Sequence, residues 1–295
     1  ELIGGAEGPA KKLVFNALKN KKHVVTANKA LIAKYGDQLS KIAEENNVNL
    51  EFEAAVCGGV PIIRSIKEGL IANKINRVYG IFNGTSNYIL STMDKENKNF
   101  SDVLTDAKKL GYAESNPLSD LNGDDVAAKL KILSSLCFNS FIDHNIHVEG
   151  INFIDKLDID NANKLGYKIK LLGVSEIINN RVYQRVHPTL IEKSSYIASI
   201  DGVLNAVIVD GKPVGQNVIQ GEGAGPEATT SALISDISSI LRGNIKFPFS
   251  ISSRERKKLS YKDISERFFS AYLRFEVLDK PGVLSNITNI FSKNK

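Results

Sequence analysis

The sequence lacks several features that would define its location or its chemistry. It has only two cysteines, Cys57 and Cys137, which lie far apart and do not form the framework of a disulfide-stapled secreted domain. We therefore expect a reducing, cytoplasmic setting. The four histidines are dispersed, which argues against a transition-metal cluster. No apolar run reaches the ~20 residues that span a bilayer, so we expect no membrane partner.

A large excess of one charge is also absent. The 38 Lys and Arg residues against 33 Asp and Glu residues give a net charge of only +5. The basic runs at residues 19–22 and 254–258 contain no interleaved aromatic residues, so we interpret them as solvated faces and expect no nucleic-acid partner. A hydrophobic content of 42% over 295 residues is enough for more than one packed core.

Helices and short strands alternate in the first part of the chain. A helical pattern starts at Pro9, a second covers residues 28–47, and β-type runs cover residues 23–26 and 50–54. This alternation is typical of the α/β class, in which crossover helices join parallel strands. Because a doubly wound sheet has more strands than these, we expect a partial Rossmann-type parallel sheet.

After Val60 the pattern changes to α+β, with strands and helices that do not alternate strictly. We expect one sheet with helices covering one of its faces. The predicted strands are residues 75–82, 148–154, 168–177, 181–186 and 203–209, and the predicted helices are residues 101–111, 124–138 and 229–241.

A third pattern starts near the C-terminus. A polar, basic linker runs through Arg267, an alternating strand covers residues 268–278, and a turn at residues 279–282 leads into a helix at residues 283–291. One strand and one helix cannot bury a core alone, so we expect the start of a further small domain.

The densest group of chemically useful side chains lies between Gly111 and Lys129. A loop precedes a helix in which Asp125 and Lys129 lie four residues apart on one flank, while Lys131 is expected to point into water. A plain surface ion pair is the alternative, which helix geometry alone does not exclude. The predicted buried stripe of this helix is Val126, Leu130, Leu133 and Cys137.

Short segments with distinctive residues are spread along the chain: residues 25–30 (VTANKA), 53–61 (EAAVCGGVP), 83–90 (NGTSNYIL), 114–129 (ESNPLSDLNGDDVAAK), 186–189 (VHPT), 205–206 (NA) and 221–225 (GEGAG). In this order, these segments resemble the homoserine dehydrogenase family. The resemblance implies an oxidoreductase that interconverts L-homoserine and L-aspartate 4-semialdehyde with NAD or NADP, in threonine, methionine and isoleucine biosynthesis.

The resemblance assigns roles one residue at a time. Lys129 matches the catalytic lysine, which exchanges a proton with the substrate oxygen as hydride moves. Asp125 matches a catalytic and substrate position, and Glu114 and Asp120 match acidic substrate contacts that suit the ammonium group of homoserine. Asp120 is also placed to hold the Lys129 ammonium. Lys29 matches a catalytic lysine at the carboxyl edge of the parallel sheet, where a surface lysine at a helix start is the alternative.

The cofactor contacts implied by the resemblance are Lys29, Gly111, Glu114 and Gly225. The glycine segment that ends at Gly225 lacks the spacing of a dinucleotide fingerprint, so a generic glycine turn is the alternative. We expect the phosphate-binding loop and the residue that reads the ribose to lie upstream of Glu1, which leaves the choice between NAD and NADP open. The chain alone is expected to bind cofactor weakly and to be weakly active or inactive.

A monovalent cation, Na⁺, is also implied. The backbone carbonyls of Glu53, Val56, Gly58 and Val60 match the family's ligands for this ion. Carbonyl oxygens suit hard, weakly held cations, and glycines permit the tight wrap that such a loop requires. A plain glycine-rich turn between two domains is the alternative.

The resemblance divides the chain into three units. Residues 1–58 match the C-terminal part of the dinucleotide-binding domain. Residues 59–250 match the catalytic, substrate-binding and dimerisation domain, whose helix at residues 225–242 is expected to pack back on the first unit. Residues 268–295 match the start of an ACT domain, a ferredoxin-like fold with threonine as its effector in the full-length family. A homo-oligomer, dimer or tetramer, is expected.

Two positions depart from the family pattern. Cys57 stands where many relatives have a small residue, and Asn116 stands where Asp is common; we expect neither to abolish the chemistry. Cys57 also leaves open a second reaction, acylating semialdehyde dehydrogenation with its thiolate as nucleophile. A non-catalytic, amino-acid-binding regulatory module is a further alternative. His187, which precedes Pro188 in a β-type run, is interpreted as structural.

Overall fold

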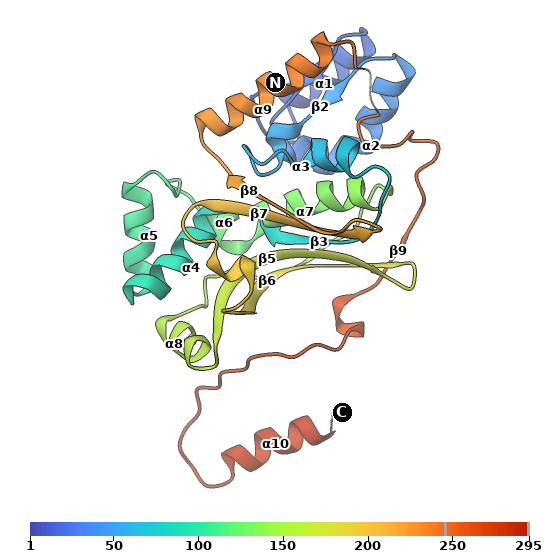
Figure 1. The fold of residues 1–295 in the computed structure, drawn as a ribbon. Coiled ribbons are helices and arrows are strands. Elements are labelled where there is room, and N and C mark those ends of the chain that lie inside the picture. Colours follow the sequence, from blue (N-terminus) through green and yellow to red (C-terminus); the bar gives the residue numbers. More distant parts are fainter. Residues whose placement is uncertain (245–246, 294–295) are drawn as a thin grey trace.

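The computed structural model describes residues 1–244 and 247–293. Residues 245–246 and 294–295, which belong to the predicted second and third units, lie outside this description. Figure 1 shows a small α/β unit above a broad sheet, with the last helix apart from both. Throughout the described ranges, no helix combines the length and the apolarity needed to cross a membrane.

The α/β unit is built on two parallel strands, β1 (Val24–Val25) and β2 (Leu50–Glu51), with α1 (Pro9–Lys19) and α2 (Lys29–Glu45). Asn28 starts α2 because its side chain accepts a hydrogen bond from the backbone N–H of Leu31. Helix α9 (Pro226–Leu241), from much later in the chain, packs against β1 and against the helical turn η1 (Glu53–Ala55). The parallel pair confirms the predicted partial Rossmann-type sheet.

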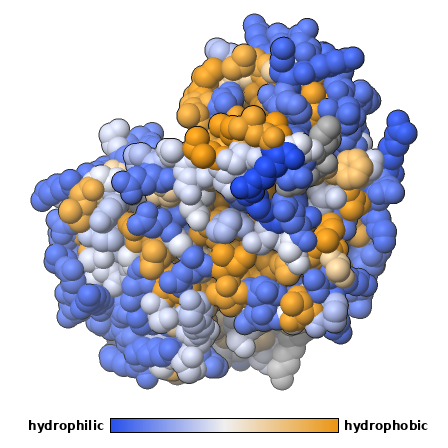
Figure 2. Space-filling view, turned by 45° about the horizontal axis from the view of Figure 1, so that its top comes forward, coloured by the Kyte–Doolittle hydropathy of each residue, from blue (hydrophilic) through white to orange (hydrophobic). Residues whose placement is uncertain are grey.

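Hydrophobic side chains remain exposed on the α/β unit, as the upper part of Figure 2 shows. On α9 they include Ile234, Ile237 and Leu241, of which Leu241 is 82% exposed. A two-stranded sheet with few helices thus leaves part of its apolar surface uncovered.

A mainly antiparallel sheet, with seven strands in the described residues, forms the second part of the molecule. Its spatial order is β4-β6-β5-β3-β7-β8, and β9 pairs with β6. The long strands pair antiparallel, while the short β4 and β9 pair with β6 in parallel. The strands are β3 (Lys74–Ile81), β4 (His147–Val148), β5 (Tyr167–Ile178), β6 (Arg181–Glu192), β7 (Leu204–Lys212), β8 (Gly215–Glu222) and β9 (Ser260–Tyr261).

Helices cover one face of this sheet (Figure 1). Helix α7 (Asp124–Cys137) packs on β3 and β5, and its predicted apolar stripe is buried. Gly173 of β5 allows this close packing, because a Cβ there would lie 3.0 Å from the Val126 side chain of α7 and 2.8 Å from the Phe82 ring. The other helical elements of the sheet domain before β7 are α3 (Ile62–Arg64), η2 (Ser65–Gly69), α4 (Gly84–Glu96), α5 (Phe100–Lys109), α6 (Leu118–Asn122), α8 (Lys156–Lys164) and η3 (Tyr196–Ser199).

Several predicted boundaries are wrong. The strand expected at residues 148–154 is only the short β4, because a bend and a turn follow at residues 151–153; Gly150 approaches α6 closely, since a Cβ there would lie 2.2 Å from the carbonyl oxygen of Leu121. The strand expected at residues 50–54 ends at Glu51 because η1 follows it. Strand β6 continues past the predicted end to Glu192, and α4, α8 and β8 were not predicted.

The strand predicted at residues 268–278 does not form. The segment has no strand partner among the described residues, and Phe268 is 98% exposed. A lone strand leaves its backbone groups unpaired, so local alternation is not sufficient to form one. Two more helical elements follow β9, the turn η4 (Ile264–Glu266) and the predicted helix α10 (Val283–Lys293). The ACT-like fold stays a prediction.

Two predictions about exposed cations are also wrong. Arg256 belongs to a run that was expected to be solvated, but its side chain is only 5% exposed and pairs with Asp37 and Glu44. Lys131 was expected to point into water, but it is 19% exposed and lies 3.0 Å from Asp143. In both cases the acidic partners lie too far along the chain for a local pattern to find them.

Candidate active site

Two helices from different parts of the chain meet at one carboxylate. Lys29 is the first residue of α2, and Asp125 lies in the first turn of α7. The Nζ atom of Lys29 lies 2.8 Å from Oδ1 of Asp125, although the Lys29 side chain is 43% exposed and that of Asp125 only 5%. The structure therefore brings together these two predicted site residues and joins the α/β unit to the sheet domain.

Lys129 lies one helical turn after Asp125 and shares the same carboxylate. Its Nζ atom lies 2.8 Å from Oδ2 of Asp125 and donates a 2.7 Å hydrogen bond to the backbone carbonyl of Phe82. The Lys129 side chain is buried. An ammonium group has three N–H donors, so these two contacts leave one donor for a bound ligand.

Asn83 connects the second acidic residue to this cluster. It caps α4 by accepting a hydrogen bond from the N–H of Ser86, and its Nδ2 atom donates to Asp120 (2.8 Å) and to Asp125 (2.9 Å). Among the described residues Asp120 forms no direct ion pair with Lys129, because Asn83 is its hydrogen-bond partner, but its charge contributes to the raised pKa of Lys129. Asn83 was assigned no role from the sequence, although an Asn before a helix start is a recognisable cap.

The charges of the cluster stabilise one another. Burial alone would raise the pKa of Asp125, but Lys129 and Lys29 outweigh it and hold that pKa below its usual range. Burial would lower the pKa of Lys129, but Asp125 outweighs it and the pKa is raised. Burial raises the pKa of Asp120, against the opposing effect of the Asn83 hydrogen bond. Lys129 is therefore an ammonium group at neutral pH.

The loop with Glu114 and Gly111 lies at the rim of this cluster. Gly111 has a left-handed backbone (φ 76) just after α5. The hydroxyl of Thr85, in the first turn of α4, fixes the loop by donating a 2.6 Å hydrogen bond to the carbonyl of Tyr112. Glu114 is exposed and, among the described residues, forms no ion pair with Lys29 or Lys129.

Two glycine-rich segments, residues 53–60 and 221–225, lie against each other. The N–H of Gly59 donates a 2.9 Å hydrogen bond to the carbonyl of Glu222. Cys57 and Gly58 both have left-handed backbones (φ 56 and 41), and a Cβ on Gly58 would lie 2.8 Å from the carbonyl oxygen of Gly223. Gly225 begins α9. The structure thus places the segments of the predicted ion site and of the predicted cofactor site side by side.

The carboxylate of Glu53 is used inside the fold. It accepts 2.8 Å hydrogen bonds from the N–H groups of Ile63 and Arg64, and burial raises its pKa to about 7. Across residues 1–244 and 247–293, no group of three or more His, Cys, Asp or Glu side chains is arranged to hold a metal. Any ion in this region would depend on backbone carbonyls.

Cys57 is fully buried, whereas His187 of β6 is half-buried and lines a surface pocket. The Cys57 thiol is buried, which raises its pKa to about 11, so it is not a thiolate nucleophile at neutral pH. This argues against acylating dehydrogenation.

His187 accepts a hydrogen bond from Arg185, its other ring nitrogen contacts the carbonyl of Pro188, and burial lowers its pKa. These contacts are those of a structural histidine.

Replacing Asp125 with Asn should destabilise the fold, because two ammonium groups would lose their shared carboxylate. We expect a loss of about 3–5 kcal/mol at pH 7. Since folding lowers the pKa of Asp125, its contribution is present at neutral pH and is lost as the pH falls below the usual Asp pKa of about 4. The difference between parent and variant should therefore shrink in acid, which urea unfolding at pH 7 and pH 3 measures.

The neighbouring Asp124 provides the control for this test. It lies in the same helical turn but is exposed, so Asp124→Asn should cost less than about 1 kcal/mol. Equal stability of the two variants at pH 7 would contradict the shared-carboxylate model.

Comparison with known proteins agrees with this geometry. Residues 61–238 match the family model for homoserine dehydrogenase, and residues 3–53 match the model for the NAD-binding domain of homoserine dehydrogenase. The chain is 42% identical to the homoserine dehydrogenase of Neisseria gonorrhoeae, covering 99% of this chain and 69% of that protein. It is 44% identical to that of Helicobacter pylori, covering 100% and 69%.

Solved structures give the same result. A homoserine dehydrogenase from Thiobacillus denitrificans superposes with a TM-score of 0.90 at 41% identity, covering 99% of this chain and 69% of that one. A hyperthermophilic archaeal homoserine dehydrogenase, solved in complex with NADPH, superposes with a TM-score of 0.72 at 27% identity, covering 83% and 73%. The chain belongs to the homoserine dehydrogenase family of nicotinamide-dependent oxidoreductases.

Proposed function

We propose that Lys129 carries the proton transfer of homoserine dehydrogenation. The observation that supports this role is its ammonium group, which uses two N–H donors on Asp125 and Phe82 and has one left for a substrate oxygen. A bound nicotinamide cofactor supplies or accepts the hydride. In reduction of the aldehyde, Lys129 gives its proton to the carbonyl oxygen as the alcohol forms; in oxidation, it takes the hydroxyl proton back.

The residues around Lys129 have separate proposed roles. Asp125 orients both lysines, because its two oxygens are already paired with them, and it raises the pKa of Lys129. Asp120 and Glu114 are the proposed partners of the substrate ammonium group. Lys29 lies beside the reacting centre with its side chain partly exposed, where it can meet an anionic group of the substrate or the cofactor.

The glycine segment before α9 fits a dinucleotide. Nothing lies within 4 Å of a Cβ built on Gly225, so a cofactor phosphate has room to approach the start of this long helix. Lys29, Gly111 and Glu114 are proposed as further cofactor contacts. NADPH in the archaeal relative supports NADP here, and the family's NAD-binding domain supports NAD.

Replacing Lys129 with Ala should lower the turnover number by at least ~10²-fold, as expected for a positioned proton-transfer group. Because the pKa of Lys129 is raised, the parent enzyme should reduce the aldehyde at a rate that is flat through neutral pH and falls only in strong alkali. Homoserine oxidation should instead rise with pH, since it needs the neutral amine. Lys131→Ala, two residues along the same helix, is the control. Near-parent turnover in Lys129→Ala would reject the role.

We also propose a monovalent-cation site at the backbone carbonyls of Glu53, Val56, Gly58 and Val60. Two observations support it. The left-handed residues of this segment wrap the backbone tightly. The side-chain amide of Asn205 is fully buried and lies against Gly223, and among the described residues its only polar side-chain contact is with the Cys57 thiol, so part of its hydrogen-bonding capacity is unused.

A bound ion should raise the melting temperature. We expect a higher value in sodium chloride than in choline chloride at equal ionic strength, because an ion that binds only the folded state stabilises it by mass action. Identical melting temperatures in the two salts, across a range of concentrations, would argue against the site.

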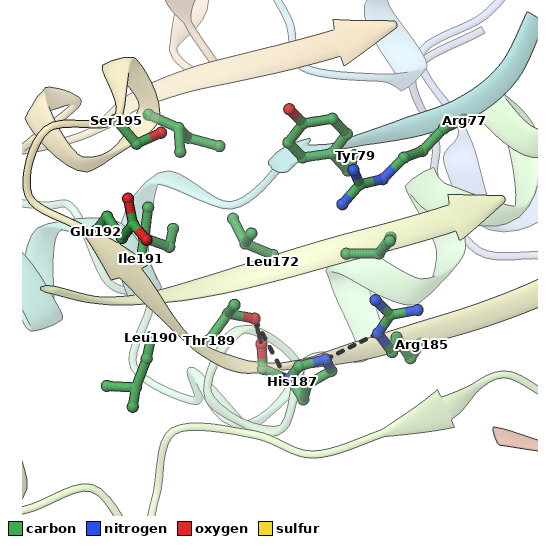
Figure 3. Close-up of a pocket in the computed structure, with 12 residues that line it drawn as sticks. Arg77, Tyr79, Leu172, Arg185, His187, Thr189, Leu190, Ile191, Glu192 and Ser195 are labelled. Atoms are coloured by element: carbon green, nitrogen blue, oxygen red, sulfur yellow. Dashed lines mark hydrogen bonds between the residues drawn. The ribbon is translucent and has the colours of Figure 1, made fainter. Parts of the chain in front are cut away.

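A homo-oligomer is proposed on the face of the sheet opposite α7. Figure 3 shows Arg77, Arg185 and Glu192 on this face around an apolar floor that includes Leu172. Among the described residues, neither Arg77 nor Glu192 forms an ion pair. A two-fold axis would let Arg77 of one copy meet Glu192 of the next, because such an interface pairs the same surface with itself.

Charge exchange tests this interface. Arg77→Glu should weaken the dimer, measured by sedimentation equilibrium, and adding Glu192→Arg in the same chain should restore it. Association that is unchanged by Arg77→Glu, or that is not restored in the double variant, would exclude this pairing.

Two further proposals concern the location of the enzyme and its regulation. A cytoplasmic location is supported by the two cysteines, both of which are free and buried. Threonine is proposed as an effector of an ACT-like unit that includes α10, which threonine titration of the complete enzyme checks.

A further inference from the structure

Residues 249–257, which follow α9 in the chain, pack against the α/β unit. We call residues 249–257 the strap. Phe249 is 1% exposed, and its ring centroid lies 5.2 Å from that of Phe52 and 5.9 Å from that of Phe141. Phe52 follows β2 in the α/β unit, whereas Phe141 follows α7 in the sheet domain. One buried ring of the strap therefore contacts both parts of the molecule.

Helix α2 has a socket for this ring at Gly36. A Cβ on Gly36 would lie 2.7 Å from Cζ of Phe249 and 3.2 Å from a ring atom of Phe141. A Cβ at such distances would force the rings to move. The middle of α2 thus approaches both aromatic rings as closely as glycine allows.

Arg256 fastens the strap to the same helix. Its guanidinium lies 2.9 Å from Asp37 and 3.0 Å from Glu44, and it donates a 2.9 Å hydrogen bond to Ser40. These three partners lie in the second half of α2. Planar guanidinium groups hold carboxylates in fixed geometry, so this contact constrains orientation as well as distance.

The strap is also tied to the end of α7. The N–H of Lys257 donates a 3.1 Å hydrogen bond to the carbonyl of Asn139, two residues beyond that helix. Helices α2 and α7 pack against each other. Their first turns meet at Lys29 and Asp125, whereas the strap joins the second half of α2 to the residues after α7.

We propose that Phe249 and Arg256 are positioning residues for the reaction. By fixing α2 against α7 at the far end of the two helices, the strap holds Lys29 on Asp125 at the near end. The α/β unit, which carries the proposed cofactor contact Lys29, is thereby set at one distance from Lys129. Small displacements of reacting groups are costly: about 1 Å can reduce the rate by ~10²-fold. This inference rests on the proposed roles of Lys29 and Lys129.

The test is a double-mutant cycle in the complete enzyme between Arg256→Met and Lys29→Met. Arg256→Met keeps most of the side-chain volume and removes the charge. We expect the turnover number to fall at least ~10-fold with the folded fraction intact. The Lys29→Met loss should shrink in the Arg256→Met background, because both changes disturb one contact. Arg254→Met, at an exposed position of the strap, should leave turnover unchanged.

Further variants separate positioning from folding. Arg256→Lys retains the charge and should recover part of the turnover, whereas Gly36→Ala should lower it by displacing Phe249. The pH profile should stay unchanged in all of them, since Asp125 still sets the pKa of Lys129. Unchanged turnover in Arg256→Met would overturn the inference. So would a double variant whose loss of turnover equals the product of the losses in Arg256→Met and Lys29→Met. If Lys29→Met alone had no effect, the proposed role of Lys29 would fail instead.

Discussion

The carboxylate of Asp125 is the group on which the rest of the site depends. One of its oxygens holds Lys29 from the α/β unit, and the other holds Lys129 and Asn83 from the sheet domain. Because Asp125 is buried, these charge interactions are stronger than they would be in water. The same group therefore joins two parts of the fold and keeps the candidate catalytic lysine charged.

The neighbouring helices and strands keep Asp125, Lys29 and Lys129 in position. Helix α7 lies flat on the sheet, where Gly173 makes room for Phe82, whose carbonyl fixes Lys129. Helix α2 runs beside α7, and the strap fastens its far half through Phe249 and Arg256. The segments at residues 53–60 and 221–225 also lie against each other, so the proposed ion-binding segment is next to the segment that ends at the proposed cofactor contact Gly225. The buried charges around Asp125 are thus kept in position by contacts that lie elsewhere in the fold.

Some of this could be predicted from the sequence and some could not. The buried stripe of α7 and the Asp125–Lys129 pair depend on contacts within one helix, so periodicity was sufficient. The meeting of Lys29 with Asp125 is a contact between distant segments, and only the family resemblance pointed to it. Asn83 and Arg256 were missed because their partners are remote in sequence, and the strand at residues 268–278 failed because its pattern gives no information about a partner.

The most direct test of the account is the pKa of the Lys129 ammonium, measured by NMR titration of enzyme with labelled lysine side chains. If Asp125 holds Lys129, the pKa of Lys129 lies above the usual lysine value of about 10.4. That pKa then falls when Asp125 is replaced with Asn. A value at or below the usual one in the parent enzyme, with no change in the variant, would contradict the shared carboxylate as the basis of the site.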